Sequence, residues 1–166
     1  MKKPGIIEFH EMLKNKEVTS AELIKDSISN AYELQKKCNA FVTIIDDANG
    51  EFNENNYLSG IPYGIKDNYS TKDILSTGSS NTLKDYVPFF DATAIVNLKN
   101  NGAVGVAKTA LDEFGMGGTG LTAHTGIIKN PWDDTRICGG SSAGSACSVA
   151  AVSYTHLRAH ETLRHL

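Results

Sequence analysis

A glycine- and serine-rich stretch, RICGGSSAGSACSVAA, occupies residues 136–151 and leads into an apolar run. Such a stretch can be a flexible linker, a cradle for phosphate or a serine-based catalytic site. A phosphate-binding P-loop carries Gly-Lys-Ser/Thr after its glycines, whereas Ala143, Gly144 and Ser145 follow here. The phosphate reading is therefore the weakest of the three. A second group is needed to choose between linker and catalytic site.

Lys66 is that second group, because it ends the apolar run IPYGIK at residues 61–66. Burial at a strand end would lower the pKa of the amine and let a neutral lysine act as a base. The alternative is a lysine whose stem lies along the strand while its ammonium reaches water. A desolvated lysine that takes the proton a serine must lose is a known nucleophilic design. Lys66 and the serines at 141–145 could form such a pair.

Periodic patterns predict the elements that would position these residues. Thr19 and Glu22 form a capping box at the start of an amphipathic helix over residues 19–37. AFVTII, which begins at Ala40, predicts a short strand, and residues 61–68 predict a strand that ends in a polar turn.

The middle of the chain predicts a crossover. Asp91 can cap a helix over residues 92–101 that Gly102 ends, and residues 103–108 predict another strand. Strand, crossover helix and strand is typical of a parallel α/β sheet. Residues 109–140 are rich in glycine with little periodicity, which favours a functional loop region.

Taken together, these strings resemble the amidase signature family. The matching pieces are SAELI, NAFVTI, GIPYGIKDN, DATAIVNLKNNGAVGVAKTALDEFGMG, NPWD and GGSSAGSA, and they cover nearly all of residues 1–152 in family order. The resemblance implies an α/β fold, a mixed and largely parallel sheet covered by helices. It also implies amide-bond hydrolysis by a Ser-Ser-Lys triad, with Lys66 as the base and Ser141 as the bridging serine that relays the proton.

The resemblance puts the nucleophilic serine about two dozen residues beyond Ser141, in a DTGGS-type segment. That count ends near His165, in SYTHLRAHETLRHL at residues 153–166, which is rich in histidine and arginine, unlike the lysine-rich chain before it. Neither Ser148 nor Ser153 has the glycine context of the nucleophile. We therefore expect residues 1–152 to be the amino-terminal part of an amidase domain and residues 153–166 to be a non-native tail. Without the nucleophile, we expect this chain to be inactive.

Within the family, LDEFGMGG followed by NPWD most resembles the glutaminase subunits of tRNA-dependent amidotransferases. This resemblance implies that Met116 and Gly117, with Ser141, contact the glutamine substrate. It implies subunits B and C as partners, with misacylated tRNA bound through the complex. It implies no cofactor in this subunit, and ATP and Mg²⁺ in the partner subunit. For Met116, core packing is the alternative.

Two other functions stay open at this point. One is a stand-alone amidase for another small amide, because GTGLTAHTG at residues 118–126 replaces a more polar pattern found in many members. The other is a truncated, non-catalytic binding module.

Asp112 and Glu113 suit structural hydrogen bonding better than acid–base work. His124 suits loop bracing better than metal binding, so no metal site is expected.

Composition limits the possible classes. The 166 residues are 40% hydrophobic and carry a net charge of −3 with a pI near 5.9, which argues against a broad basic surface for nucleic acid. The three cysteines, at positions 38, 138 and 147, form no CxxC pair, so neither a disulfide framework nor zinc is suggested. With no signal peptide and no membrane-length apolar run, we expect a cytoplasmic protein.

Overall fold

The computed structural model describes residues 4–151. The segment at residues 153–166, predicted to be non-native, lies outside them. The helices are α1 (Ile6–Lys14), α2 (Ser20–Cys38), α3 (Thr93–Asn100) and α4 (Ala143–Ala150), and the strands are β1 (Phe41–Ile44), β2 (Pro62–Lys66) and β3 (Val104–Thr109). Two short 3-10 helices span Asn81–Leu83 and Glu113–Gly115.

The three strands form one mixed sheet in the order β1-β3-β2. β2 runs parallel to β3, and β1 runs antiparallel to β3. The predicted crossover is confirmed, because α3 connects β2 to the adjacent parallel strand β3. The predicted α/β fold with a mixed sheet is thus observed, with one parallel and one antiparallel pairing among the described strands.

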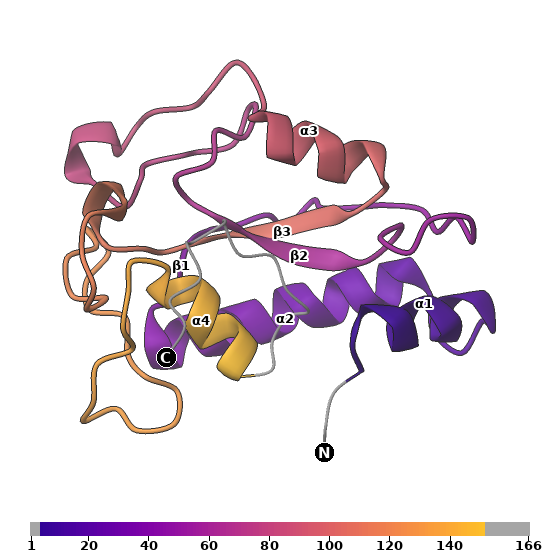
Figure 1. The fold of residues 1–166 in the computed structure, drawn as a ribbon, viewed down its shortest axis with the longest axis horizontal. Coiled ribbons are helices and arrows are strands. Elements are labelled where there is room, and N and C mark those ends of the chain that lie inside the picture. The colour runs from indigo at the N-terminus through magenta and orange to yellow at the C-terminus, as the bar shows by residue number, and fades with distance from the viewer. Residues whose placement is uncertain (1–3, 152–166) are drawn as a thin grey trace, which may run out of the picture.

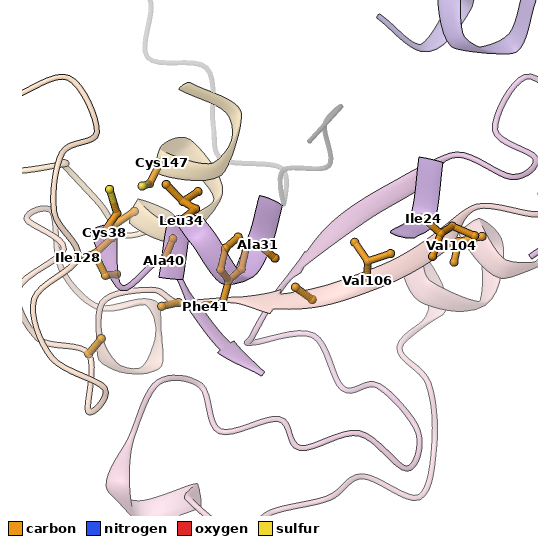
Figure 2. Packing of buried hydrophobic residues seen from close by; sticks show 14 residues of the cluster. Ile24, Ala31, Leu34, Cys38, Ala40, Phe41, Val104, Val106, Ile128 and Cys147 are labelled. Atoms are coloured by element: carbon orange, nitrogen blue, oxygen red, sulfur yellow. The ribbon is translucent and has the colours of Figure 1, made fainter. Parts of the chain in front are cut away.

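The sheet lies between two helical layers. α3 covers one face, while α1, α2 and α4 lie on the other side (Figure 1). On the α3 side, Tyr63 and Ile65 of β2 pack against Ile95 of α3. On the opposite side, the larger core joins α2, β1, β3 and α4 (Figure 2), with Leu34, Phe41, Val106 and Cys147 among its members.

The capping box predicted at the start of α2 is observed. The Thr19 hydroxyl accepts a hydrogen bond from the Glu22 amide, and the Glu22 carboxylate accepts one from the Thr19 amide. This reciprocal pairing satisfies donors that the first helical turn cannot use internally. Asn39 ends the helix in the left-handed conformation (φ 55°).

The predicted cap of α3 by Asp91 is wrong. The N-cap residue is Ala92, which makes no side-chain cap. The Asp91 carboxylate instead accepts a hydrogen bond from the Lys72 amide at 2.8 Å and pairs with the Lys99 ammonium at 2.7 Å. These two partners take the carboxylate away from the first turn. Gly102 follows the helix with φ +75°, as expected for the residue that ends it.

α1 and the long loop complete the described chain. The sequence patterns did not predict α1, whose Leu13 packs with Leu23 of α2 and Ile61 before β2. Thr109 ends β3, and residues 110–140 are irregular except for the short helix Glu113–Gly115 and an isolated bridge between Lys129 and Ile137, in line with the loop region expected there.

Candidate active site

Lys66 is the last residue of β2, and its side chain is buried, with 4% exposure. Its Nζ atom donates a hydrogen bond to Ser141 Oγ over 3.1 Å. The two residues are 75 positions apart in sequence. The structure thus brings together the two residues for which the resemblance implied base and bridging roles, and it rules out a Lys66 ammonium that reaches water.

Backbone contacts hold Ser141 at the carboxyl end of β3. Its carbonyl oxygen accepts a hydrogen bond from the Asp112 amide over 3.0 Å, and the Gly144 amide donates to the Ala110 carbonyl over 2.9 Å. Parallel strands place their carboxyl ends at one edge of the sheet. Since Lys66 pairs with Thr109 in the β2–β3 register, these contacts position Ser141 beside Lys66.

Close packing against backbone atoms requires a glycine at position 144, near the start of α4. A Cβ atom there would collide with the Ala40 carbonyl oxygen and approach Ala110 N and O to 2.6 Å. Because these neighbours are backbone atoms, no side chain can rotate out of the way. The close approach also lets the Ser145 and Thr109 hydroxyls meet at 2.7 Å.

The glycines before Ser141 shape the loop in different ways. Gly139 has φ +80°, a conformation that favours glycine. The peptide bond between Gly140 and Ser141 is cis. A Cβ atom on Gly140 would collide with the Asp112 carboxylate. The flexible-linker reading of this segment is therefore wrong, since the loop is packed closely and leads directly into α4.

Asp112 organises the loops around Ser141. The carboxylate is fully buried and accepts hydrogen bonds from the Thr119 amide, the Gly120 amide and the Thr122 hydroxyl. Burial alone would raise the pKa of this carboxyl, but the three hydrogen bonds outweigh it and hold the pKa below its ordinary value. Asp112 is thus the structural hydrogen-bonding group that its position suggested.

A buried charge pair next to Lys66 was missed by the sequence analysis. Lys108 Nζ lies 3.7 Å from Asp67 Oδ1, and both side chains are at most 1% exposed. Lys108 also donates to the Tyr69 carbonyl and to the hydroxyls of Thr71 and Ser76, over 2.6–3.0 Å. Burial lowers the pKa of Lys108 to about 8, although Asp67 opposes this.

Asp67 uses its other carboxylate oxygen to hold the loop after β2. Asp67 Oδ2 accepts hydrogen bonds from the amides of Thr77 and Ser79 and from the Thr77 hydroxyl. Burial nevertheless raises the pKa of this carboxyl. The pair therefore ties residues 67–79 to the sheet edge where Lys66 ends β2. The only sequence signal was a pair of charged residues at the ends of two apolar strands.

The two residues expected to contact substrate lie at the edge of this arrangement. Met116 is 80% exposed, so the alternative of core packing is wrong. Gly117 lies so close to Asp112 that a Cβ atom would be 2.6 Å from its Cγ. Gly117 and Ser141 thus both border Asp112. Gly117 lies against the Asp112 side chain, and the Ser141 carbonyl accepts a hydrogen bond from the Asp112 amide.

The arrangement is suited to proton transfer. A serine hydroxyl can donate one hydrogen bond while it accepts another, so Ser141 can pass a proton between a third group and Lys66. The start of α4 adds partial positive charge beside Ser141.

Within residues 4–151, no three His, Cys, Asp or Glu side chains are grouped so that they could hold a metal ion. No helix in that part of the chain is long and apolar enough to cross a membrane.

A surface hollow lies elsewhere, between α2, the loop at 129–134 and the end of α4. Leu34, Cys38 and Trp132 are among its lining residues, whereas Lys66 and Ser141 are not. We therefore do not assign this hollow to the Lys66–Ser141 site.

Comparison of the sequence with known proteins agrees with the fold and with the buried lysine–serine pair. Residues 22–155 match the Amidase family, and the chain belongs to that family. Among curated relatives, the A subunit of glutamyl-tRNA(Gln) amidotransferase from Streptococcus pneumoniae (strain 70585) is 45% identical over 157 residues. The corresponding protein of Streptococcus thermophilus (strain CNRZ 1066) is 41% identical over 155 residues. Each match covers 88% of this chain and 32% of the relative.

Solved structures show the same relationship. The A subunit of glutamyl-tRNA(Gln) amidotransferase from Thermotoga maritima superposes with a TM-score of 0.80 at 34% identity, over 92% of this chain and 32% of that one. Peptide amidase from Stenotrophomonas maltophilia gives a TM-score of 0.82 at 23% identity, over 92% of this chain and 35% of that one, which shows the shared fold. The chain thus spans about a third of the length of the proteins it matches.

Proposed function

We propose that residues 1–152 are the amino-terminal part of the glutamine-hydrolysing subunit of a tRNA-dependent amidotransferase. The observation that carries this proposal is the buried hydrogen bond from Lys66 Nζ to Ser141 Oγ, over 3.1 Å. The 45% identity to the pneumococcal amidotransferase protein supports the choice of this branch of the family. In this role the subunit releases ammonia from glutamine, and the complex uses it to convert Glu-tRNA(Gln) or Asp-tRNA(Asn) to Gln-tRNA or Asn-tRNA.

In the proposed mechanism, Lys66 is the base and Ser141 relays the proton. A nucleophilic serine attacks the glutamine amide, its proton passes through Ser141 to neutral Lys66, and the same route returns a proton to the leaving ammonia. We place the nucleophile outside residues 4–151. The buried Ser148 does not suit that role, because its hydroxyl donates to the Ser145 carbonyl within α4.

The substrate and partners follow from the same proposal. The exposed Met116 and the adjacent Gly117 would form one wall of the glutamine site, close to Ser141. Subunits B and C would complete the complex in the cytoplasm and bind the misacylated tRNA, which agrees with the net negative charge of this chain. ATP and Mg²⁺ would be bound by the partner subunit.

The experiment starts from source DNA. We would sequence the gene past codon 151, express its complete product with the subunits B and C of the same source, and measure ammonia released from glutamine. We expect Lys66→Met and Ser141→Ala each to lower the rate by about 10²–10⁴-fold, the usual contribution of positioned acid–base groups. Ser29→Ala, on the exposed face of α2, is the matched control and should leave the rate unchanged.

The outcomes separate the other candidate functions. A stand-alone amidase, whose substrate the unusual sequence at 118–126 leaves open, would hydrolyse another small amide and would not copurify with subunits B and C. A gene that truly ends after residue 166 and whose product binds those subunits without glutaminase activity would support a non-catalytic binding module. Full glutaminase activity in both Lys66→Met and Ser141→Ala would contradict the proposed mechanism.

A further inference from the structure

Three thiols gather beside the Ser141 loop, and one of them, Cys38, is about a hundred positions away from the other two in sequence. Cys38 ends α2, Cys147 lies in α4, and Cys138 directly precedes Gly139. Cys38 and Cys147 belong to the larger core, and the half-buried Cys138 packs against it. Figure 2 shows the sulfur atoms of Cys38 and Cys147 pointing toward one another near Leu34. All three cysteines are free thiols.

The helix geometry of α4 brings Cys147 to Cys138. The Cys138 thiol donates to the Ala143 carbonyl, with a sulfur–oxygen distance of 3.4 Å. Ala143 and Cys147 are four residues apart and therefore share a helix face, and helical side chains lean toward the amino-terminal turn. Cys147 therefore lies next to Cys138, and the interaction of the two thiols lowers the pKa of Cys138 and raises that of Cys147.

The two cysteines differ in the way that a redox pair requires. Cys138 is half-buried, and its lowered pKa favours the thiolate, which is the form that reacts with peroxides. Cys147 is fully buried, and its raised pKa keeps it in the thiol form. An oxidised Cys138 would therefore have a second thiol close by, on the face of α4 that Cys138 packs against.

The chain between these cysteines contains Ser141. A disulfide needs its sulfur atoms about 2.05 Å apart, much closer than two unbonded thiols approach. Cys147 is fixed in a buried helix, so the adjustment would fall on Cys138 and the glycines that follow it. Gly140 already touches the Asp112 carboxylate, and the Ser141 carbonyl is held by the Asp112 amide. A shift of this loop would change the 3.1 Å contact between Ser141 and Lys66.

We propose that Cys138 and Cys147 are a peroxide-sensitive thiol pair, and that their disulfide withdraws Ser141 from Lys66 and switches off the amidase. The switching part rests on the proposed function. The Cys138 thiolate attacks one oxygen of hydrogen peroxide, an S–O bond forms, the O–O bond breaks, and the departing hydroxide takes up a proton to give water. The Cys147 sulfur then attacks the sulfenic acid, the S–S bond forms, and a second water leaves with the Cys147 proton. Two thiols are oxidised and one peroxide is reduced to two waters.

Peptide mapping of the 166-residue chain tests the pair directly. Trypsin leaves Cys138 and Cys147 together in peptide 137–158, and Cys38 in peptide 38–66. After hydrogen peroxide and alkylation, we expect peptide 137–158 to lose two hydrogens and take up no alkylating agent, with recovery on reduction by dithiothreitol. Cys38→Ser should behave in the same way. Cys147→Ser should lose the internal bond and leave Cys138 as a sulfenic acid that dimedone traps.

Two results of the mapping would overturn the pair. The first is a disulfide that links peptides 38–66 and 137–158. The second is an internal bond that forms only after the chain is unfolded in urea. Cys138→Ser is a second variant for the case in which Cys147→Ser does not fold, and it should also abolish the internal bond.

The switch is tested on the complete gene product with its partner subunits. Glutaminase activity should be lost in peroxide, recover with dithiothreitol, and persist in Cys138→Ser. Unchanged activity after quantitative disulfide formation would overturn the switch. If the reduced complex never hydrolyses glutamine, the proposed function fails and the switch fails with it, whereas the mapping still decides whether the thiol pair exists.

Discussion

Gly144 lets the start of α4 pack directly against the backbone beside β1 and β3. Its neighbours are the backbone atoms of Ala40 and Ala110, which belong to the segments that flank β1 and β3. The same contact sets the distance between Ser141, three residues earlier, and Lys66 at the end of β2. The absence of a side chain at position 144 is therefore as important to the site as the Ser141 hydroxyl itself.

We expect Gly144→Ala to lower the free energy of unfolding by about 1–3 kcal/mol, because the added methyl group overpacks against immobile backbone. In an open helix the same change would stabilise by about 1 kcal/mol, so the predicted sign is specific to this contact. Urea unfolding of the chain provides the measurement. Gly118→Ala is the matched control, since no atom lies within 4 Å of the added methyl group. Equal stability of the two variants would contradict the packing argument.

Lys108 and Asp67 are the second feature at this scale. We expect Lys108→Met to cost about 3–5 kcal/mol, because it leaves the buried Asp67 carboxylate without its counter-charge. Asp67→Asn combined with Lys108→Met should cost less than the sum of the two single changes, since neither partner is then left as an isolated charge. Urea unfolding of the two single variants and the double variant gives the coupling. Additive losses would show that the two groups do not interact across the 3.7 Å gap.

At the scale of elements, α2 supplies Ile24, Ala31, Leu34 and Cys38 to the core on the α4 side of the sheet. Leu34 and Cys38 of this helix pack with Phe41 of β1 and Cys147 of α4. The helix begins at a capping box and ends at Asn39, so its register relative to the core is set at both ends by local hydrogen bonds. α4, and with it Ser141, packs partly on this helix.

We expect Thr19→Ala to lower the free energy of unfolding by about 1 kcal/mol, the usual contribution of an N-cap side chain. Loss of the Thr19 hydroxyl leaves the Glu22 amide without its acceptor. The comparison is Ser29→Ala, which removes a hydroxyl from the exposed middle of the same helix and should stabilise slightly, because alanine is the better helix former. Thermal unfolding followed by circular dichroism distinguishes the two.

At the scale of the whole molecule, buried charges make stability depend on pH at both ends of the scale. The folded pKa of Asp112 lies below the ordinary value of 3.8, so its contribution is present above that value and is lost as the pH falls through the folded pKa. Lys108 has a folded pKa of about 8 and an ordinary value of 10.5. Between these two values the unfolded chain binds more protons, and stability rises with pH.

Difference measurements isolate each group. As the pH falls below 3.8, the free energy of unfolding of the wild-type chain should decrease more steeply than that of Asp112→Asn. Between pH 8 and 10.5, the wild type should gain stability relative to Lys108→Met. Urea unfolding at a series of pH values gives both slopes. A slope of the opposite sign in either range would mean that the group is not charged as its contacts imply.

Much of the fold could be predicted from local patterns. The capping box at Thr19 and the strand, helix and strand between residues 61 and 109 were found because each depends on neighbours within a few residues. Asp91 was wrongly assigned as a cap because its carboxylate contacts Lys72, which lies in a distant loop. α1 was not predicted at all. At the site, Lys66 and Ser141 were identified from their motifs, and Asp112 was expected to be a structural group because adjacent carboxylates, here Asp112 and Glu113, point apart.

By itself, the sequence determined the family, the order of the elements from α2 to β3, and Lys66 and Ser141 as the two residues of the proposed proton-transfer pair. Only the tertiary structure decided which groups surround them. Alternation along β3 would put Lys108 on the same face as Val104 and Val106, but the register slips by one residue between Gly105 and Ala107, and Lys108 meets Asp67 instead. The gathering of Cys38, Cys138 and Cys147 likewise depends on how α4 packs against the end of α2. The spacing and types of the residues do not predict such contacts, because sheet register and helix packing are set by the whole core.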